Sequence, residues 1–471
     1  MIGDLEAEVL VVGGGPAGAA CALALANLRR RVVLCEAARF PREHVGVCLS
    51  PGVIHQLGFL GIRHILNDPA HLTDVPLELR WGSSGFQPAP VPTLIADRGR
   101  FDADMLGAGA DCGVRVLQPA RINRLARDGS GWQADLIEPS GRRTIRARLV
   151  IDARGRTSRA RPRRTWMGPR TLALRGAWSG NTEATVRIGA AASSWSWTAP
   201  IAGRRRLAIA FTAPHILRQM TGSLADGYLR LLEEAGVLGP GLDLEGEPRV
   251  CDATPYQIDD DEPGVLRIGD ADTALDPLSS SGVQAAIQSA LRAGPVVNTL
   301  LTPSSDKDAA IEYWNARRSA QAATHRSWSS DRYSEAYQFH PTDFWRVRAA
   351  PMPSRIENTL PATPLPSPDQ LLAVSAAAKL VQTPSLIGAQ VVRTTSLSHP
   401  NLQEAVAFVD GVPLHAVLTP MSQLSTAAEL IAIWQTAFSL EKALAVLGWL
   451  WRNGIITARL EAPAAAAHRR D

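Results

Sequence analysis

The sequence contains very little lysine and few cysteines. Of its 49 basic residues only Lys307, Lys379 and Lys442 are lysine, and the net charge is only +4. So small a charge does not require a nucleic-acid partner. The five cysteines include no pair at CxxC spacing. This argues against a disulfide framework and favours a reducing, cytoplasmic location. It also argues against a cysteine zinc site, and we expect the protein to bind no metal.

Long hydrophobic runs are also missing. No stretch approaches the roughly 18 consecutive apolar residues of a transmembrane helix, and the acidic start MIGDLEAE does not resemble a secretory signal. The chain nevertheless has 471 residues, 45% of them hydrophobic and 20% charged. It is therefore long enough to bury cores for about two to four domains, and we expect no membrane span.

A dinucleotide-binding signature lies near the N-terminus. A strand at 8–12 leads into three glycines at GxGxxG spacing, an apolar helix at 19–28, and a second strand at 31–35. Such a loop lets the backbone approach a pyrophosphate and points a helix N-terminus at it. A carboxylate 18 residues after the last glycine can accept hydrogen bonds from ribose hydroxyls, which a simple tight turn would not explain. The predicted cofactor residues here are Gly13, Gly15, Pro16, Ala17, Gly18 and Glu36.

Two later segments favour FAD over NAD. An apolar strand at 149–152 ends in Asp152, and another strand near 265–268 is followed by Gly269-Asp270, a loop and a helix that begins near Gly282. A carboxylate such as Asp270 can hold a ribityl hydroxyl, and the N–H groups of a helix start can face the flavin pyrimidine ring. No second GxGxxG follows a strand, so NAD(P)H would bind transiently or a separate flavin reductase would supply the electrons.

Taken together, these motifs resemble the group A flavoprotein monooxygenases and their relatives, which include flavin-dependent halogenases and geranylgeranyl reductases. Three segments resemble the halogenase-like branch: FPREHVGVCL at 40–49 its FPRxHVGESL stretch, DPLSSSG at 276–282 its DPLxSSG loop, and WSWTAP at 195–200 its WxWxIP motif. The resemblance covers about residues 5–350. It implies further FAD-binding roles for Arg42, Arg98, Pro277, Ser281, Gly282 and Val283, beside Asp152, Gly269 and Asp270.

The resemblance also implies the chemistry. Reduced flavin would react with O2 to give a C(4a)-hydroperoxide, which an electron-rich indole or phenol attacks while the protein excludes water. Tryptophan halogenases are understood to use an active-site lysine, but no lysine precedes Lys307 and arginine is a poor substitute. Hydroxylation is therefore favoured over halogenation. The catalytic candidates are His44, Asp276 and Cys48. For each of them, a purely structural role is the alternative to a catalytic one.

The middle of the chain predicts a second domain. Alternating runs at 171–178 and 207–212 indicate an antiparallel sheet, which in this class roofs the substrate pocket. Trp81, Trp178, Trp195 and Trp197 are candidates for the pocket wall, although core packing would explain each equally well. The arginine-rich stretch 154–170 is either a solvated loop or an electropositive rim.

The C-terminal part predicts a separate module. Six prolines at 349–368 indicate a linker. Beyond it we expect strands at 386–394 and 405–409, a turn at Asp410-Gly411 leading into a further strand at 412–418, helices at 425–438 and 439–453, and a final strand at 454–457. This order resembles winged-helix modules that bind leader peptides, which offer an edge strand or groove to an extended peptide. A bracing or oligomerisation domain is the alternative, and DNA binding is disfavoured.

The expected architecture is α/β with three folded parts: a Rossmann-like FAD-binding domain (1–74, 96–164 and 251–348), a substrate-binding antiparallel sheet domain (75–95 and 165–250), and a winged-helix-like α+β module (369–462), with a linker at 349–368 and a disordered tail at 463–471. The combination resembles flavoprotein monooxygenases that hydroxylate a peptide tryptophan in tryptophylquinone biogenesis, during maturation of quinohaemoprotein amine dehydrogenase. A peptide or small protein docked by 369–462 would be the substrate. The alternatives are a halogenase or small-aromatic hydroxylase, an isoprenoid reductase, and a non-catalytic FAD scaffold.

Overall fold

The computed structural model describes residues 4–42, 48–83, 85–129, 131–157, 164–180, 183–201, 203–259, 262–349, 364–419 and 425–458. The chain divides into two compact units, Met1–Pro303 with Trp314–Pro353, and Ser304–Tyr313 with Ser354–Asp471. In these described ranges, no helix is long and apolar enough to cross a membrane.

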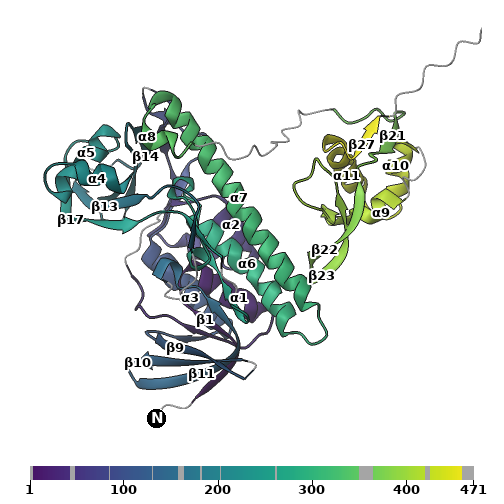
Figure 1. Cartoon of the computed structure of the whole chain (residues 1–471), viewed down its shortest axis with the longest axis horizontal. Coiled ribbons are helices and arrows are strands. Elements are labelled where there is room, and N and C mark those ends of the chain that lie inside the picture. Colours follow the sequence, from purple (N-terminus) through teal and green to yellow (C-terminus); the bar gives the residue numbers. More distant parts are fainter. Residues whose placement is uncertain are drawn as a thin grey trace, which may run out of the picture. The chain divides into compact units, whose positions relative to one another are not determined.

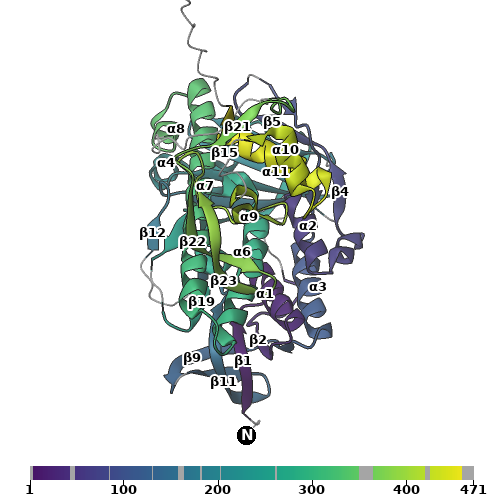
Figure 2. The same cartoon turned by 90° about the vertical axis from the view of Figure 1, so that its right-hand side faces the viewer.

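The first unit contains a seven-stranded mixed sheet in the order β8-β2-β1-β11-β10-β9, with β19 also paired to β11. The strands β8, β2, β1, β11 and β19 are parallel, whereas β9 and β10 form an antiparallel extension. Figure 2 shows β1 beside β11 near the N-terminus. Both faces of the parallel part are covered, which explains why β2 is buried along its whole length. The strands are β1 (Leu5–Val12), β2 (Val32–Cys35), β8 (Arg115–Leu117), β9 (Arg121–Asp128), β10 (Gly131–Glu138), β11 (Gly141–Asp152) and β19 (Val265–Arg267).

Helix α1 (Pro16–Asn27) follows β1 directly and packs against α3 (Arg98–Asp111) and α6 (Gly282–Leu301). Figure 1 shows α7 (Lys307–Phe339) running alongside α6. Smaller elements complete this region: α2 (Gly52–Phe59), β3 (Cys48–Leu49), β4 (Leu72–Val75), β7 (Thr93–Ile95), β12 (Arg164–Trp166), β18 (Tyr256–Ile258), β20 (Thr273–Ala274), and the 3-10 turns η1 (Arg63–Asn67), η2 (Gly155–Thr157), η3 (Gly269–Ala271) and η4 (Pro277–Ser279).

A second seven-stranded sheet has the order β17-β13-β16-β15-β14-β5-β6 and is antiparallel except between β14 and β5. Tyr228 of α5 packs in the core on one of its faces, and residues of α7 and α8 pack in the core on the other. The elements are β5 (Leu77–Arg80), β6 (Gln87–Pro88), β13 (Leu172–Gly180), β14 (Val186–Ala191), β15 (Ser194–Ile201), β16 (Arg205–Thr212), β17 (Leu242–Asp252), α4 (Pro214–Gln219), α5 (Leu224–Glu234) and α8 (Asp343–Arg346).

The second unit has its own core, built on Leu430, Trp434, Val446 and Leu450. Its strands form one three-stranded sheet in the order β26-β21-β27 and two hairpins, β22-β23 and β24-β25. The elements are β21 (Leu371–Val374), β22 (Lys379–Ile387), β23 (Gln390–Ser398), β24 (Phe408–Val409), β25 (Val412–Pro413), β26 (Ser425–Thr426), β27 (Ile456–Ala458), α9 (Leu414–Leu418), α10 (Ala427–Trp434) and α11 (Leu440–Arg452).

The structure confirms the turn at Asp410-Gly411 and the helix expected at 439–453, which Ser439 caps and which ends before Gly454. Three local predictions are wrong. The expected strand 386–394 crosses a hairpin turn, because Gly388 has a φ of +58° and reverses the chain. Residues 414–418 are helical, and the helix expected from residue 425 begins at Ala427, because Thr426 caps it in a capping box with Glu429. Most of the expected linker (350–363) and the whole tail 463–471 lie outside the described residues.

Candidate active site

Three chain segments meet around the glycine loop at the N-terminus of α1. Gly13 has a φ of +108°, and a Cβ there would lie 2.5 Å from the carbonyl oxygen of Ala153, directly after β11. A Cβ on Gly18 would lie 1.8 Å from the carbonyl oxygen of Gly13, and one on Gly269 would lie 2.9 Å from Cβ of Ala17. The loops after β1, β11 and β19 therefore gather at the carboxyl ends of parallel strands, where α/β sheets bind nucleotides.

A buried charged network lies beside this loop. Glu36 is 5% exposed, and its Oε2 accepts a 2.6 Å hydrogen bond from the amide of Gly14. Arg42 lies 3.6 Å from both Glu36 and Asp102, and Arg98 donates two hydrogen bonds to Asp102. Nε of Arg42 is buried and has no hydrogen-bond partner in the described part of the chain. A buried donor without an acceptor, next to a glycine loop, fits a site for a phosphate-bearing cofactor.

The other predicted cofactor residues differ in exposure and in the partners that they already have. Asp152 is held by two hydrogen bonds from Arg154, whereas Asp270 is 42% exposed and lies 3.4 Å from Nε of Arg156. Pro277 begins the turn η4, and Ser281, before Gly282 and Val283, gives α6 no side-chain cap. The first N–H groups of α6 can therefore bind an outside acceptor. A small cleft beside this helix, with a cavity volume of about 20 Å³, is lined in part by Gly269, Asp270 and Gly282.

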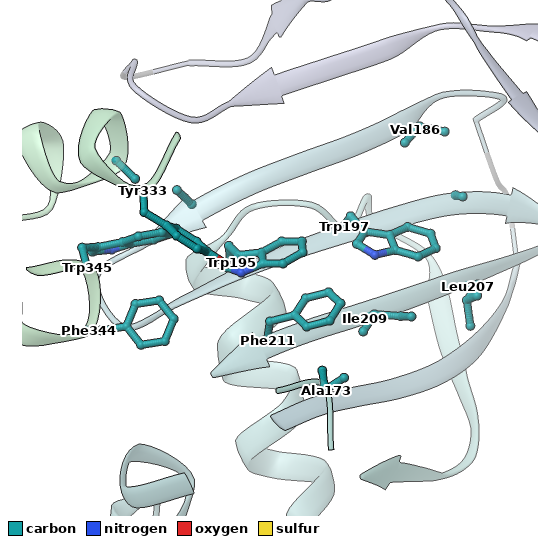
Figure 3. Close-up of a cluster of buried hydrophobic side chains, with 14 of the residues drawn as sticks. Ala173, Val186, Trp195, Trp197, Leu207, Ile209, Phe211, Tyr333, Phe344 and Trp345 are labelled. Atoms are coloured by element: carbon teal, nitrogen blue, oxygen red, sulfur yellow. The ribbon is translucent and has the colours of Figure 1, made fainter. Parts of the chain in front are cut away.

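An aromatic face covers the side of the second sheet that α7 and α8 pack against (Figure 3). Trp195 of β15 stacks on Phe211 of β16, with ring centroids 3.9 Å apart. Trp81 lies 6.2 Å from Trp195 and 5.4 Å from Trp345 of α8. Trp197 belongs to the same cluster. We call the residues Trp81, Trp195, Trp197, Phe211, Tyr333, Phe344 and Trp345 the aromatic face.

Candidate catalytic residues adjoin the aromatic face. Cys48, and Leu278 of the 276–282 loop, pack against its cluster, so the structure brings together sequence motifs that are more than 200 residues apart. Burial raises the pKa of the Cys48 thiol to about 12, so it is protonated at neutral pH. His44 lies outside the described residues. Within those residues, no group of histidine, cysteine and acidic side chains is placed to hold a metal.

Trp178 corrects one sequence expectation. In the register of β13 with β16 it lies opposite Arg206, whereas Ala177 lies opposite Leu207 of the aromatic cluster. Strand side chains alternate between the two faces of a sheet, so Trp178 lies on the opposite face, which packs against α5 and which we call the α5 face. There its Nε1 donates to the hydroxyl of Tyr228. It is therefore not part of the predicted pocket wall.

Asp276 is joined to residues that the sequence interpretation missed. Its Oδ1 accepts hydrogen bonds from the hydroxyl of Tyr333 and the amide of Leu278, and its own amide donates to Nε2 of His325. Burial lowers the pKa of His325 to about 4, so the ring is neutral. His325, Ser329 and Tyr333 are spaced four residues apart, which places them on one face of α7. This four-residue spacing was the sequence pattern from which His325 and Tyr333 could have been found.

Comparisons with known proteins agree with this geometry. Two family models match: an FAD-binding domain at residues 6–173, and tryptophan halogenase at residues 91–363. The chain is 28% identical over 337 residues to tryptophan 2-halogenase of Chondromyces crocatus, an alignment that covers 65% of this chain and 64% of that relative. It thus spans less than two thirds of the relative's length.

Two solved structures share the fold over almost the whole chain. The peptidyl tryptophan dihydroxylase QhpG, described as essential for tryptophylquinone cofactor biogenesis, has a TM-score of 0.74 at 23% identity and covers 95% of this chain and 99% of its own. The flavin-dependent halogenase CmlS has a TM-score of 0.75 at 19% identity, with 97% and 96% covered. At these identities the likeness shows the fold alone.

Proposed function

We propose that this chain, which belongs to the tryptophan halogenase family of FAD-dependent oxidoreductases, hydroxylates an indole ring instead of halogenating it. The ring would be a tryptophan side chain in a peptide that is being converted to a tryptophylquinone. The observation that carries the choice of hydroxylation is the absence of lysine. The first unit, which contains both the glycine loop and the aromatic face, has none, since Lys307, Lys379 and Lys442 all belong to the second unit.

FAD would be held at the glycine loop. Glu36 would exchange its bond to the Gly14 amide for the adenosine ribose, and Arg42 would direct its unpaired Nε at the cofactor. Asp270 would hold the ribityl chain, and the uncapped start of α6 would face the flavin ring. When bound and reduced, FAD supplies the electrons and activates O2 for attack by an electron-rich ring.

The protein's own contribution is to orient the ring and exclude water. Trp195 is 1% exposed and Trp345 is fully buried, so water has little access to the aromatic face. An indole bound against its edge would gain edge-to-face or stacked contacts, each worth about 0.5–1.5 kcal/mol. Exclusion of water protects a reactive oxidant from decomposition.

Two observations support a peptide substrate over a free aromatic compound. QhpG, a peptidyl tryptophan dihydroxylase, matches 95% of this chain, which includes most of the second unit. In addition, β22 is nine residues long and pairs only with β23 in the described part of the second unit. Its other edge can add an extended peptide as a further strand.

The test is to mix full-length reduced enzyme with O2, chloride and bromide, and either a peptide with one tryptophan or free tryptophan. We expect peptide products that gain one or two oxygen atoms and no halogen, as measured by mass spectrometry. Halogenated tryptophan would support the second candidate, a halogenase, which the match to the tryptophan halogenase model favours. If free tryptophan were hydroxylated as efficiently as the peptide, this would argue against a peptide as the specific substrate.

A further inference from the structure

A carboxyl, a phenol and a guanidinium are buried together at the aromatic face. Asp276, Tyr333 and Arg348 are 8%, 3% and 6% exposed and come from the loop before η4, from α7 and from the segment after α8. The Tyr333 hydroxyl donates a 2.8 Å hydrogen bond to Oδ1 of Asp276. Capping of the η4 turn requires only the 3.0 Å bond from Leu278 to Asp276. The loop's own structure therefore does not account for Tyr333.

Burial and the neighbouring charges shift the pKa values of both members of this pair. Burial raises the pKa of the Asp276 carboxyl, whereas the Leu278 amide, the Tyr333 hydroxyl, Arg348 and Arg156 act in the opposite direction. Burial and then the Asp276 carboxylate raise the pKa of Tyr333, so its hydroxyl is protonated. A carboxyl with a raised pKa is a better proton acceptor than an ordinary surface carboxylate.

Arg348 is fixed in place beside the pair. Its guanidinium donates to the carbonyl of Phe344 at 2.9 Å and to Oγ1 of Thr171 at 3.0 Å, and it lies 3.8 Å above the Phe344 ring. Its positive charge favours the charged forms of both Asp276 and Tyr333. The buried carboxylate thus has a counter-charge that is already oriented, as buried charges require.

Trp195 supplies a donor that its surroundings do not use. Its Nε1 forms no hydrogen bond by distance and angle within the described residues, yet it lies close enough to the Tyr333 hydroxyl to lower that group's pKa. Figure 3 shows the Tyr333 ring directed toward Trp195. Because Trp195 lowers the pKa of Tyr333, it favours negative charge that develops on the phenol oxygen.

We propose that Tyr333 and Asp276 form the proton acceptor for the hydroxylation; this inference rests on the proposed function. Once the ring carbon carries the new oxygen, its C–H bond must break so that the ring becomes aromatic again. The electron pair returns to the ring, the proton bonds to the Tyr333 oxygen, and the original Tyr333 proton bonds to Oδ1 of Asp276. No electron is transferred in this step, and the proton leaves to solvent after product release.

The experiment compares full-length wild type with Tyr333→Phe, Asp276→Asn and Trp195→Phe. The matched control is Tyr228→Phe, which removes an equally buried hydroxyl on the α5 face. Each FAD-loaded enzyme is reduced and mixed with O2 and a peptide whose single tryptophan is deuterated on the indole ring. For Tyr333→Phe and Asp276→Asn we expect product formation to slow about 10²-fold and a primary isotope effect to appear. Trp195→Phe should slow it less, and Tyr228→Phe should match wild type.

A second readout requires no turnover. In infrared spectra taken against Asp276→Asn, wild type should show a carboxylate at neutral pH, and Tyr333→Phe should raise the pH at which this group becomes protonated. His325 is the other titratable group bonded to the loop, and its pKa of about 4 keeps it neutral over most of that range. A protonated Asp276 in wild type at neutral pH would overturn the relay, because that carboxyl could accept no proton.

The two hypotheses fail in different ways. A wild-type enzyme that releases the peptide unchanged would contradict the proposed function. A wild type that hydroxylates the peptide, with a Tyr333→Phe variant as fast as Tyr228→Phe and without an isotope effect, would overturn the relay alone.

Discussion

Each of the two faces of the second sheet carries a buried tryptophan beside a buried tyrosine, but the hydrogen-bond partners of the two pairs differ. On the α5 face, Trp178 donates to the Tyr228 hydroxyl, which donates to the carbonyl of Ala208. On the aromatic face, the Trp195 Nε1 has no hydrogen-bond partner among the described residues, and Tyr333 donates to the carboxyl of Asp276. The first arrangement is a closed chain of neutral groups, and the second contains a charge and an unused donor.

This difference distinguishes packing from chemistry. Buried polar groups are normally paired, and a protein tolerates an unpaired group or a buried charge mainly where function requires it. The α5 face is also tightly packed, since a Cβ on Gly176 would lie 2.7 Å from Leu244 and 3.1 Å from Tyr228. We therefore propose that the α5 face is structural and that the reaction takes place at the aromatic face.

The largest predicted effect compares Trp178→Ala with Trp195→Ala. Both side chains are at most 3% exposed, so each truncation should lower the free energy of unfolding by about 3–5 kcal/mol. Only Trp195→Ala should slow hydroxylation by the folded enzyme. Urea unfolding and single-turnover rates at low temperature measure the two quantities. Equal loss of rate in both variants would show that the faces do not differ in function.

A second prediction uses pH. Burial lowers the pKa of His325 from 6.5 to about 4, so the folded protein resists protonation there while the unfolded chain does not. The stability from the neutral ring is complete above about pH 6.5 and decreases as the pH falls toward 4, by at most about 3 kcal/mol. His325→Gln should remove this decrease. Unfolding free energies of both proteins from pH 7 to 4 test it, and parallel curves would contradict it.

A third prediction concerns the closed chain of the α5 face. Tyr228→Phe leaves the Trp178 N–H and the Ala208 carbonyl without their partner. The free energy of unfolding should therefore fall by about 1–2 kcal/mol, equally at pH 7 and pH 5 because no charge is involved. Thermal or urea unfolding at the two pH values measures this. A loss that depended on pH would mean that this face also contains a titrating group.

The comparison also shows what a sequence can reveal. The glycine loop was predictable because its constraints are local: Gly13 and Gly18 touch each other within six residues, and Glu36 follows on the next strand. The helix start near Gly282 and the helix at 439–453 depend on similarly short patterns. FAD binding, which the family models also show, follows from such local signals.

The face of each tryptophan could not be predicted in this way. The register that pairs Trp178 with Arg206 determines it, and a one-residue slip would move Trp178 to the opposite face. The β15 strand has buried residues on both faces, so no polar alternation distinguishes them. Tyr333 was missed for a related reason, since 57 residues separate it from Asp276 and only the path of α7 brings them together.

The smallest predicted effect concerns Cys48, which packs against the aromatic face but carries no charge. Because burial raises its pKa to about 12, the thiol is neutral at working pH and a poor nucleophile. Cys48→Ala should change the free energy of unfolding by no more than about 1 kcal/mol and leave the hydroxylation rate and its pH profile unaltered. A thiol reagent should modify exposed Cys112 well before Cys48. If Cys48→Ala instead slowed the reaction of a stably folded enzyme as much as Tyr333→Phe, the aromatic face would contain a second essential group besides the Tyr333–Asp276 pair.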